Sequence, residues 1–407
     1  MALVDAEVDA LVRAERARRR GALQLLAGEN LASAGVRGAL GSEFGDKYAE
    51  GYPGRRHHTG CGVADELEEL AARRARELFH AEHANVQPYS GTLAMLAAYA
   101  ALLRPGDGIL AMALADGGHL TGGSAANFSG RWFRAGEGYR VREKDGRIDM
   151  DEVRALALRQ RPKVIVAGGI SYPRAIDWAA FRAVADEAGA ALLADVSQIT
   201  GLIAAGVLES PVPYAHVVCA TTHKLLRGPR GGLLLCATGL AERVDRAVFP
   251  FVQGGPSLNE VAAKAVAFGE AATPEYRAYA ERTVENAHAL AVALSGHGIR
   301  PLTGGTDTHL VTADLRGLGI TGREAELRAE RAGILVGRCA VPHDPAPPSA
   351  AAGIRMGTGC VTTQGMTPDR MPRVAELLAA ALADADGSRA RDLAAAAAEL
   401  AAPTSAD

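Results

Sequence analysis

Apolar residues along the first two thirds of the chain follow helical and strand periods in alternation. Helical patterns cover residues 64–79 and 92–103, and Asp177 and Gly189 bracket a third helix as its N-cap and C-cap residues. Short apolar runs typical of buried strands lie at 84–87, 109–114, 164–167, 191–196, 216–220 and 233–236. This alternation predicts an α/β fold whose mostly parallel sheet is covered on both faces.

A second, smaller unit is expected after the glycine-rich segment 253–256. Thr321 and Glu324 have the spacing of a capping box, and Gly333 is placed to end the helix that they open. The other elements expected here are helices at 274–294 and 370–383 and strands at 309–315 and 334–336. We therefore predict an N-terminal arm at 1–30, a large domain at 31–273, a small α+β C-terminal domain at 274–385 and a loosely ordered tail at 386–407.

The composition is that of a soluble globular protein. Of the 407 residues, 48% are hydrophobic and 22% are charged, with a formal net charge of −3. That charge gives no electrostatic footprint for nucleic acid, and no apolar run approaches the roughly 18 residues of a transmembrane helix. The first 20 residues lack the apolar segment of a secretory signal. The five cysteines are widely spaced without a CxxC pair, so we expect reduced thiols, no metal site and a cytoplasmic location.

Lysines are scarce, which limits any chemistry that needs an amine nucleophile. Only five of the 44 basic residues are lysines, and Lys224 alone follows an expected strand, 216–220, within the segment Thr-Thr-His-Lys. Ligands bind at the carboxyl ends of strands in open α/β sheets, and a buried lysine titrates low enough to form a Schiff base. The alternative is an exposed lysine in an ordinary loop.

Three further features complement this lysine. Asp195 closes an apolar strand and needs a partner, either a protonated ring nitrogen or the amides of a helix N-terminus. Ser90, Gly91 and Thr92 form a strand-to-helix turn that suits either an anion or an ordinary N-cap. Arg355 lies in an apolar, glycine-flanked segment, where it would bind a carboxylate or form a structural ion pair. Together with the lysine, these features fit pyridoxal 5'-phosphate (PLP) chemistry on an amino acid.

Several segments around these residues resemble the serine hydroxymethyltransferase family, whose members are PLP enzymes with the aspartate aminotransferase fold. The resemblance covers about residues 23–375. It is carried by Lys-Tyr-Ala-Glu-Gly-Tyr-Pro-Gly at 47–54, by Thr-Thr-His-Lys at 221–224, and by segments 81–88, 117–121, 213–218, 227–232 and 304–307. The resemblance implies the PLP-dependent transferase fold, with a large domain that binds the cofactor.

The resemblance also implies roles for individual residues at the cofactor. Lys224 would carry the Schiff base, Asp195 would keep the pyridine nitrogen protonated, and His119 would stack on the ring. The remaining cofactor contacts would come from Ser90, Gly91 and Thr92 at the phosphate, from Gly254 and Gly255 of the partner subunit, and from Gln198, Thr221 and His223.

Substrate contacts would come from both subunits of a homodimer. Arg355 would bind the substrate carboxylate. Tyr48 and Glu50 would reach in from the partner subunit, with Glu50 transferring a proton, and His57 and His58 would complete the substrate pocket. We therefore expect a homodimer with shared active sites, either alone or within a tetramer.

The chain departs from the family pattern mainly at positions expected to contact folate or substrate. The changed positions are His57 and His58 in place of paired tyrosines, Gly28 and Ile170 in place of serines, Gln198 in place of a histidine, Cys339 in place of an asparagine, and Gln364 in place of an arginine. Each lost hydrogen bond to a ligand costs roughly 1–3 kcal/mol, so two or three such changes would be enough to weaken folate binding by orders of magnitude.

The leading hypothesis is therefore a folate-independent L-threonine transaldolase, which would move the glycine unit of L-threonine to another aldehyde. The first alternative is a true serine hydroxymethyltransferase, which would convert L-serine and tetrahydrofolate to glycine and methylenetetrahydrofolate. The second is a catalytically weak PLP-binding regulatory protein, against which the intact Lys224, Asp195 and Arg355 argue.

Overall fold

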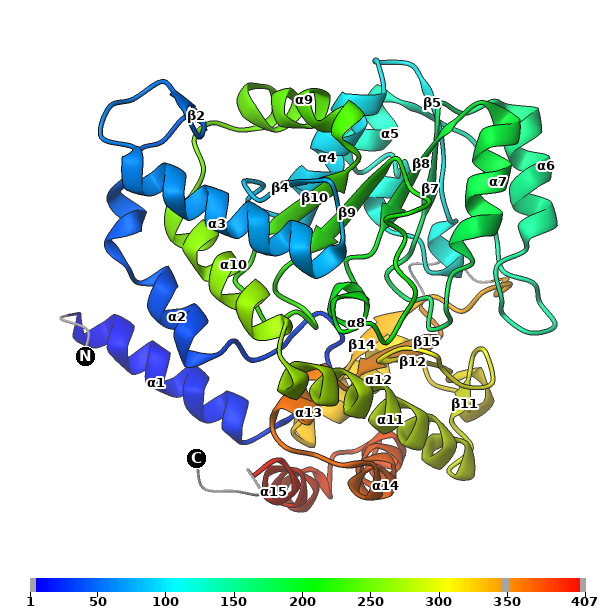
Figure 1. Cartoon of the computed structure of the whole chain (residues 1–407). Helices are drawn as coiled ribbons and strands as arrows, with labels where there is room; N and C mark the ends of the chain where they lie inside the picture. Colours follow the sequence, from blue (N-terminus) through cyan, green and yellow to red (C-terminus); the bar gives the residue numbers. More distant parts are fainter. Residues whose placement is uncertain (1–4, 346–350, 403–407) are drawn as a thin grey trace. The chain divides into compact units, whose positions relative to one another are not determined.

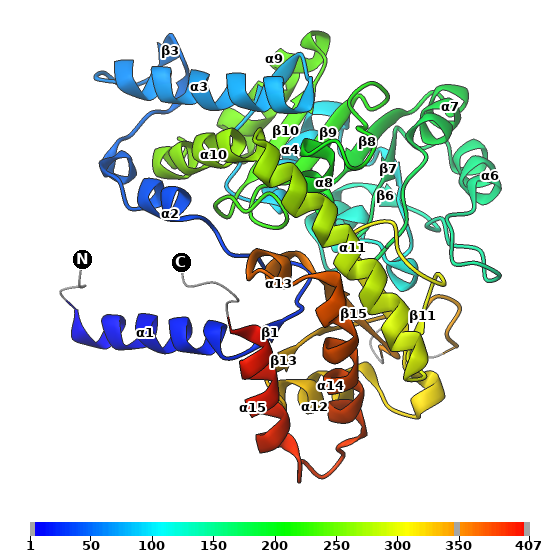
Figure 2. The same ribbon diagram turned by 60° about the horizontal axis from the view of Figure 1, so that its bottom comes forward.

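The computed structural model describes residues 5–345 and 351–402. Its chain divides into two compact units, which can be followed by the sequence colours of Figures 1 and 2. The larger unit is the continuous segment 30–281, and the smaller unit combines the residues before 30 with those after 281. This division differs from the expected boundary at 273, because α11 (Pro274–Gly296) is one continuous helix that belongs to both units.

The larger unit is built on a mixed sheet that is mostly parallel. Its seven described strands have the order β4 (His83–Asn85), β10 (Gly232–Cys236), β9 (Val217–Thr221), β8 (Ala191–Asp195), β7 (Val164–Ala167), β5 (Gly108–Leu110) and β6 (Arg134–Ala135). The strands from β9 to β6 run parallel, and β10 runs antiparallel to both β9 and β4. The predicted α/β fold with a mostly parallel sheet is confirmed.

Helices cover this sheet where the sequence pattern places them. For α7 (Trp178–Ala188), the Asp177 carboxylate accepts the Ala180 amide at 2.9 Å, and Gly189 ends the helix at φ 67°. Figure 1 shows α6 and α7 side by side, and α3 beside α10. The longer helices of this unit are α2 (Ala34–Leu40), α3 (Gly62–Phe79), α4 (Gly91–Leu102), α6 (Met150–Gln160), α9 (Thr238–Arg246) and α10 (Leu258–Ala271). A short hairpin of β2 (Gly51–Tyr52) and β3 (Arg55–Arg56) precedes α3.

The smaller unit is α+β. Its antiparallel sheet has the order β11 (Arg300–Pro301), β12 (Leu310–Asp314), β15 (Gly353–Gly357) and β14 (Gly337–Cys339). The predicted capping box opens α12 (Gly322–Arg331), because the Glu324 amide donates to Thr321 Oγ1 and the Thr321 amide donates to Glu324 Oε2. The remaining elements are β1 (Leu23–Gln24), which pairs with β13 (Ile334–Leu335), and the helices α13 (Gly359–Thr363), α14 (Met371–Ala383) and α15 (Ala390–Ala401).

Both ends of the chain differ from the expected arm and loosely ordered tail. In the described structure α1 (Ala6–Arg20) buries none of its residues, but Leu23 and Leu25 are fully buried in the core of the smaller unit. Leu393 and Ala397 of α15 enter the same core, because their spacing of four places them on one face of the helix. Residues 403–407 of the expected tail lie outside the described residues. Among the described helices, none is long and apolar enough to span a bilayer.

Candidate active site

Lys224 lies at the carboxyl edge of the central sheet. Strand β9 ends at Thr221, and the lysine follows in a tight turn. The Gly228 amide closes that turn by donating to the Thr222 carbonyl at 2.8 Å. Asn30 Nδ2 donates to the Lys224 carbonyl at 3.1 Å. Lys224 is half-buried, which argues against an ordinary exposed loop lysine.

Asp195 ends the neighbouring strand β8, where its Cα is paired with that of Cys219 in β9. Its Oδ1 accepts the amide of Ser197 at 3.0 Å, and the next helix, α8 (Thr200–Ala204), has Ile199 as its N-cap. The helix N-cap alternative for Asp195 therefore does not hold. Gly168, at φ 135° after β7, packs so closely that an added Cβ would lie 2.2 Å from the Asp195 carbonyl oxygen.

His119 lies at the same edge of the sheet, in a loop that packs against Gly169, the residue after Gly168. A Cβ added to Gly169 would lie 2.7 Å from the carbonyl oxygen of Gly117, two residues before the histidine. The His119 Nδ1 lies 2.7 Å from Thr121 Oγ1. The loops that carry His119 and Asp195 are thus packed against two adjacent glycines, Gly169 and Gly168 respectively.

The predicted phosphate turn lies against the end of β9. Ser90 Oγ accepts the Leu93 amide at 3.2 Å and caps α4. Gly91 has no room for a side chain, because an added Cβ would lie 2.4 Å from Thr221 Cγ2. Thr92 is exposed in the first turn of α4. The amides of this helix N-terminus therefore open at the strand end that also leads to the candidate lysine.

A second group of predicted residues gathers at the β2–β3 hairpin. Glu50 Oε2 and His58 Nε2 are 3.1 Å apart, and the Tyr48 ring meets the His58 ring edge-on with centroids 4.9 Å apart. His57 is turned away from this pair and lies against Phe249, with ring centroids 5.6 Å apart. The carboxylate and the imidazole form a pair that can relay a proton.

The glycines predicted to reach the phosphate from a partner subunit lie beside Glu50 of their own chain. A Cβ added to Gly255 would be 3.1 Å from Glu50 Cγ, and one added to Gly254 would be 3.6 Å from Glu50 Oε1. The Tyr89 hydroxyl donates to the Gly255 carbonyl. Gly254, Gly255 and Glu50 are all assigned to the partner's active site. They lie next to one another and would therefore reach that site together.

Comparison with known proteins agrees with this arrangement. A family model described as serine hydroxymethyltransferase matches residues 1–378. The chain belongs to the serine hydroxymethyltransferase family. A curated serine hydroxymethyltransferase from Acidobacterium capsulatum is 50% identical over 382 residues, which are 94% of this chain and 89% of that relative. The resemblance drawn from the sequence motifs is confirmed, and with it a PLP-dependent transferase fold and an enzymatic function.

Polar atoms left over at this edge of the sheet fit the cofactor of the serine hydroxymethyltransferase family. Gln198 Oε1 and His223 Nδ1 are buried and have no hydrogen-bond partner among the described residues. Burial, followed by the charges of Arg230 and Lys224, lowers the pKa of His223 to about 4, so its imidazole is neutral at pH 7. A polar ligand would satisfy both atoms, and the lysine, carboxylate and helix N-terminus around them suit PLP.

The sequence did not predict which residues hold Glu50 and the β2–β3 hairpin that follows it. The Arg56 guanidinium donates at 2.9 Å to the carbonyls of Ala49 and Gly51, which flank Glu50, and it pairs with Glu68 at 2.8 Å. Gln87 Nε2 donates to both the Gly51 carbonyl and Glu68. Burial raises the pKa of Glu68, which the Arg56 charge opposes. No cap or turn pattern marks these contacts, whose sequence separations range from 5 residues between Arg56 and Gly51 to 36 between Gln87 and Gly51.

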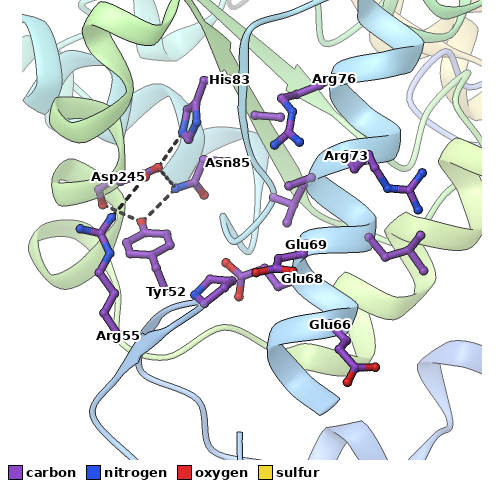
Figure 3. A pocket seen from close by; sticks show the side chains of 15 residues that line it. Tyr52, Arg55, Glu66, Glu68, Glu69, Arg73, Arg76, His83, Asn85 and Asp245 are labelled. Carbon is purple, nitrogen blue, oxygen red and sulfur yellow. Dashed lines mark hydrogen bonds and ion pairs between the residues drawn. The ribbon is translucent and has the colours of Figure 1, made fainter. Parts of the chain in front are cut away.

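A polar cleft of about 650 Å³ is lined by Glu68 of this network and by residues of the hairpin, α3, β4 and α9, as Figure 3 shows. Asp245 is the centre of a hydrogen-bonded cluster at one side of the cleft: its Oδ1 lies 2.8 Å from both His83 Nε2 and Asn85 Nδ2, and the Tyr52 hydroxyl donates to the Asp245 carbonyl at 2.6 Å. Arg55 completes the cluster 3.9 Å from the same carboxylate. These contacts join the hairpin to β4 and α9, and we interpret them as structural.

Arg355 belongs to the smaller unit, in the middle of β15. Its neighbours across the sheet are Thr312 and Gly337. Burial lowers the pKa of the guanidinium, and the electrostatic effect of Cys339 opposes this shift. Its assignment as the carboxylate clamp stays a prediction from the sequence.

Proposed function

We propose that the chain is a PLP-dependent enzyme that breaks and forms the Cα–Cβ bond of β-hydroxy-α-amino acids, acting as an L-threonine transaldolase. It would release acetaldehyde from L-threonine and join the remaining glycine unit to a different aldehyde, without tetrahydrofolate. The observation that carries this proposal is the pair of Glu50 and His58, whose side chains are 3.1 Å apart at a position where the family pattern has tyrosine.

The paired side chains supply what the first half of the reaction needs. Cleavage of the Cα–Cβ bond of a β-hydroxy amino acid turns the hydroxyl into a carbonyl, so its proton must be accepted. His58 would accept that proton while Glu50 stabilises the resulting imidazolium. In the second half, the same imidazolium would return the proton to the oxygen of the acceptor aldehyde. The pair thus serves both directions with no other proton carrier.

The residues at the sheet edge would hold the cofactor. PLP supplies an electron sink for the charge that remains at Cα. Lys224 offers the amine that binds it, and Asp195, half-buried at the end of β8, offers a carboxylate for the proton of the ring nitrogen. Ser90 and the amides that follow it would hold the phosphate.

Two residues of the smaller unit support independence from folate. Cys339 replaces the asparagine expected at the pterin, and burial raises the pKa of its thiol to about 12. A neutral thiol is a weak hydrogen-bond partner for a pterin. Gln364 replaces an arginine, and its buried Oε1 has no partner within the described residues.

The second candidate function is that of serine hydroxymethyltransferase itself. It is favoured by the 50% identity to the curated enzyme of that name from Acidobacterium capsulatum. Both candidates use the same lysine, the same ring carboxylate and the same phosphate turn. They differ in whether a folate or a second aldehyde takes part.

A substrate assay separates the two. The PLP-loaded protein is incubated with L-threonine and a panel of aldehydes, and with L-serine in the presence and absence of tetrahydrofolate. We expect acetaldehyde release to rise with an acceptor aldehyde, and mass spectrometry to find a new β-hydroxy amino acid. Glycine formation from L-serine that depends on tetrahydrofolate, with no exchange from L-threonine, would overturn the transaldolase proposal.

The two adjacent histidines offer a matched pair of variants. His58→Tyr removes the imidazole that lies beside Glu50 and should lower exchange from L-threonine at least about a hundredfold, the usual minimum for a lost acid–base group. His57→Tyr changes a ring that faces Phe249 and should keep most of the exchange. Equal losses in both variants would count against a proton-transfer role for His58.

A further inference from the structure

The segment that leads into the phosphate turn is held mainly by buried side chains, with one backbone hydrogen bond from the Gly232 amide of β10 to the Pro88 carbonyl at 2.9 Å. It follows β4, and its carbonyls at Val86 and Pro88 accept hydrogen bonds from Lys264 Nζ at 2.6 and 2.9 Å. The carbonyl between them, that of Gln87, accepts Gln253 Nε2 at 3.0 Å. Three successive carbonyls thus have side-chain donors immediately before Tyr89 and the Ser90 cap.

Lys264 lies in the middle of α10 and is fully buried. Gly231, after the Lys224 turn, closes over it so tightly that an added Cβ would lie 2.5 Å from Lys264 Cε. Burial lowers the pKa of its amine to about 8, while Glu260 and Glu68 act in the opposite direction. The amine is therefore mostly protonated at pH 7. A buried ammonium is costly to fold, and a leucine or methionine would fill the same space without that cost.

The positive charge of Lys264 would favour an anion bound on the other side of the turn that begins at Ser90. The ammonium polarises the peptide groups whose carbonyls it holds, and charge-assisted hydrogen bonds are about twice as strong as neutral ones. The same contacts fix the direction in which the chain enters α4, whose free amides form the predicted phosphate site. Positive charge behind this turn adds to the positive end of the α4 dipole.

We propose that Lys264 is a positioning residue for the cofactor phosphate, holding the carbonyls of Val86 and Pro88 so that the turn beginning at Ser90 is set to receive a dianion. This inference rests on the proposed PLP-binding function. It assigns a task to a second lysine, distinct from the amine that would bind the cofactor ring.

The test compares two ligands that differ only in the phosphate. Dissociation constants of PLP and of unphosphorylated pyridoxal are measured with the full-length protein, freed of cofactor, by titration of the visible absorbance. Lys264→Met removes the charge and keeps the length of the side chain. We expect it to weaken PLP binding at least about tenfold, the factor typical of a charged hydrogen bond, while the affinity for pyridoxal changes much less.

If Lys264 had only a structural role, its substitution would leave the ratio of PLP affinity to pyridoxal affinity unchanged. Arg74→Met is the matched control, because Arg74 also donates to a carbonyl of α10, that of Ala265 at 2.7 Å, but does not touch the phosphate segment. The control should leave the ratio unchanged. A ratio that is unchanged in Lys264→Met, with both ligands weakened equally or not at all, would overturn the proposal.

Two further measurements keep the outcome interpretable. Lys264→Gln keeps a donor without the charge and replaces the methionine variant if circular dichroism finds that variant unfolded. Borohydride reduction of wild-type protein with PLP, followed by peptide mapping, establishes whether the cofactor binds at Lys224. No labelling in wild type refutes the proposed function, whereas labelling with an unchanged ratio refutes the role of Lys264 alone.

Discussion

The neutral imidazole of His223 makes the stability of the cofactor-free protein depend on pH in acid. Its pKa is lowered from 6.5 to about 4, first by burial and then by the charges of Arg230 and Lys224. Between pH 6.5 and 4 the unfolded chain takes up a proton that the folded chain refuses. The free energy of unfolding therefore falls as the pH falls through this window, and this contribution levels off below about pH 4.

The size of the effect follows from the lowered pKa. Each pH unit by which a pKa moves corresponds to about 1.4 kcal/mol, so a pKa of about 4 in place of 6.5 corresponds to at most about 3.5 kcal/mol. His223→Asn removes the titrating ring, and we expect the variant to lose less stability than wild type between pH 6.5 and 4. Urea unfolding of the cofactor-free proteins at half-unit pH steps measures the difference.

The exposed His80 provides the control. It adopts a left-handed backbone conformation at φ 53°, which asparagine tolerates, so His80→Asn is a matched substitution outside the site. The control should follow wild type across the whole pH range. A His223→Asn curve parallel to wild type between pH 6.5 and 4 would refute the reasoning, as would a His223 ring that titrates near 6.5 by NMR.

Three other predictions concern residues of the larger unit. Gly91→Ala places a methyl group 2.4 Å from Thr221 Cγ2, so PLP affinity should fall at least about tenfold in an absorbance titration; unchanged affinity would contradict the tight turn. Glu68→Leu removes one of the two carboxylates that pair with the buried Arg56 and leaves Asp65 at 2.7 Å, so it should cost about 1–3 kcal/mol in urea unfolding; an unchanged free energy of unfolding would contradict this. Lys224→Arg should fold with an unchanged melting temperature but form no visible absorbance band with PLP, because a guanidinium does not form a Schiff base; a persisting band would move the assignment to another amine.

The elements that could be predicted from the sequence are those whose signals are local. Asp177 and Gly189 bracket α7, and Thr321 with Glu324 opens α12, because caps depend on side chains within four residues of the backbone groups that they bind. The strand before Lys224 was equally recognisable, since a buried parallel strand is a short, continuous apolar run. Family motifs then supplied the roles of the site residues.

The scaffold behind the site could not be predicted, because its contacts join residues far apart in the chain. Lys264 reads as one more position of a helix, and only the fold brings its amine to Val86 and Pro88. Arg56 is a different case: its contacts with Ala49 and Gly51 span only 7 and 5 residues, but they depend on the geometry of the hairpin, which no cap or turn pattern marks. The packing of α15 was missed because an alanine-rich sequence has little contrast between its buried and exposed faces.

The pairing of β1 with β13 has a consequence for the order of folding during synthesis. Ile334, the strand partner of Leu23, is made 311 residues after it, so the core of the smaller unit cannot be completed before that point. At 5–20 residues per second that delay is roughly 15–60 s. The larger unit is one continuous segment and can fold on the ribosome as soon as it emerges. During that interval Leu23 lacks its strand partner, and the apolar segment around Leu23 and Leu25 lacks the part of its core that comes from Ile334 onward.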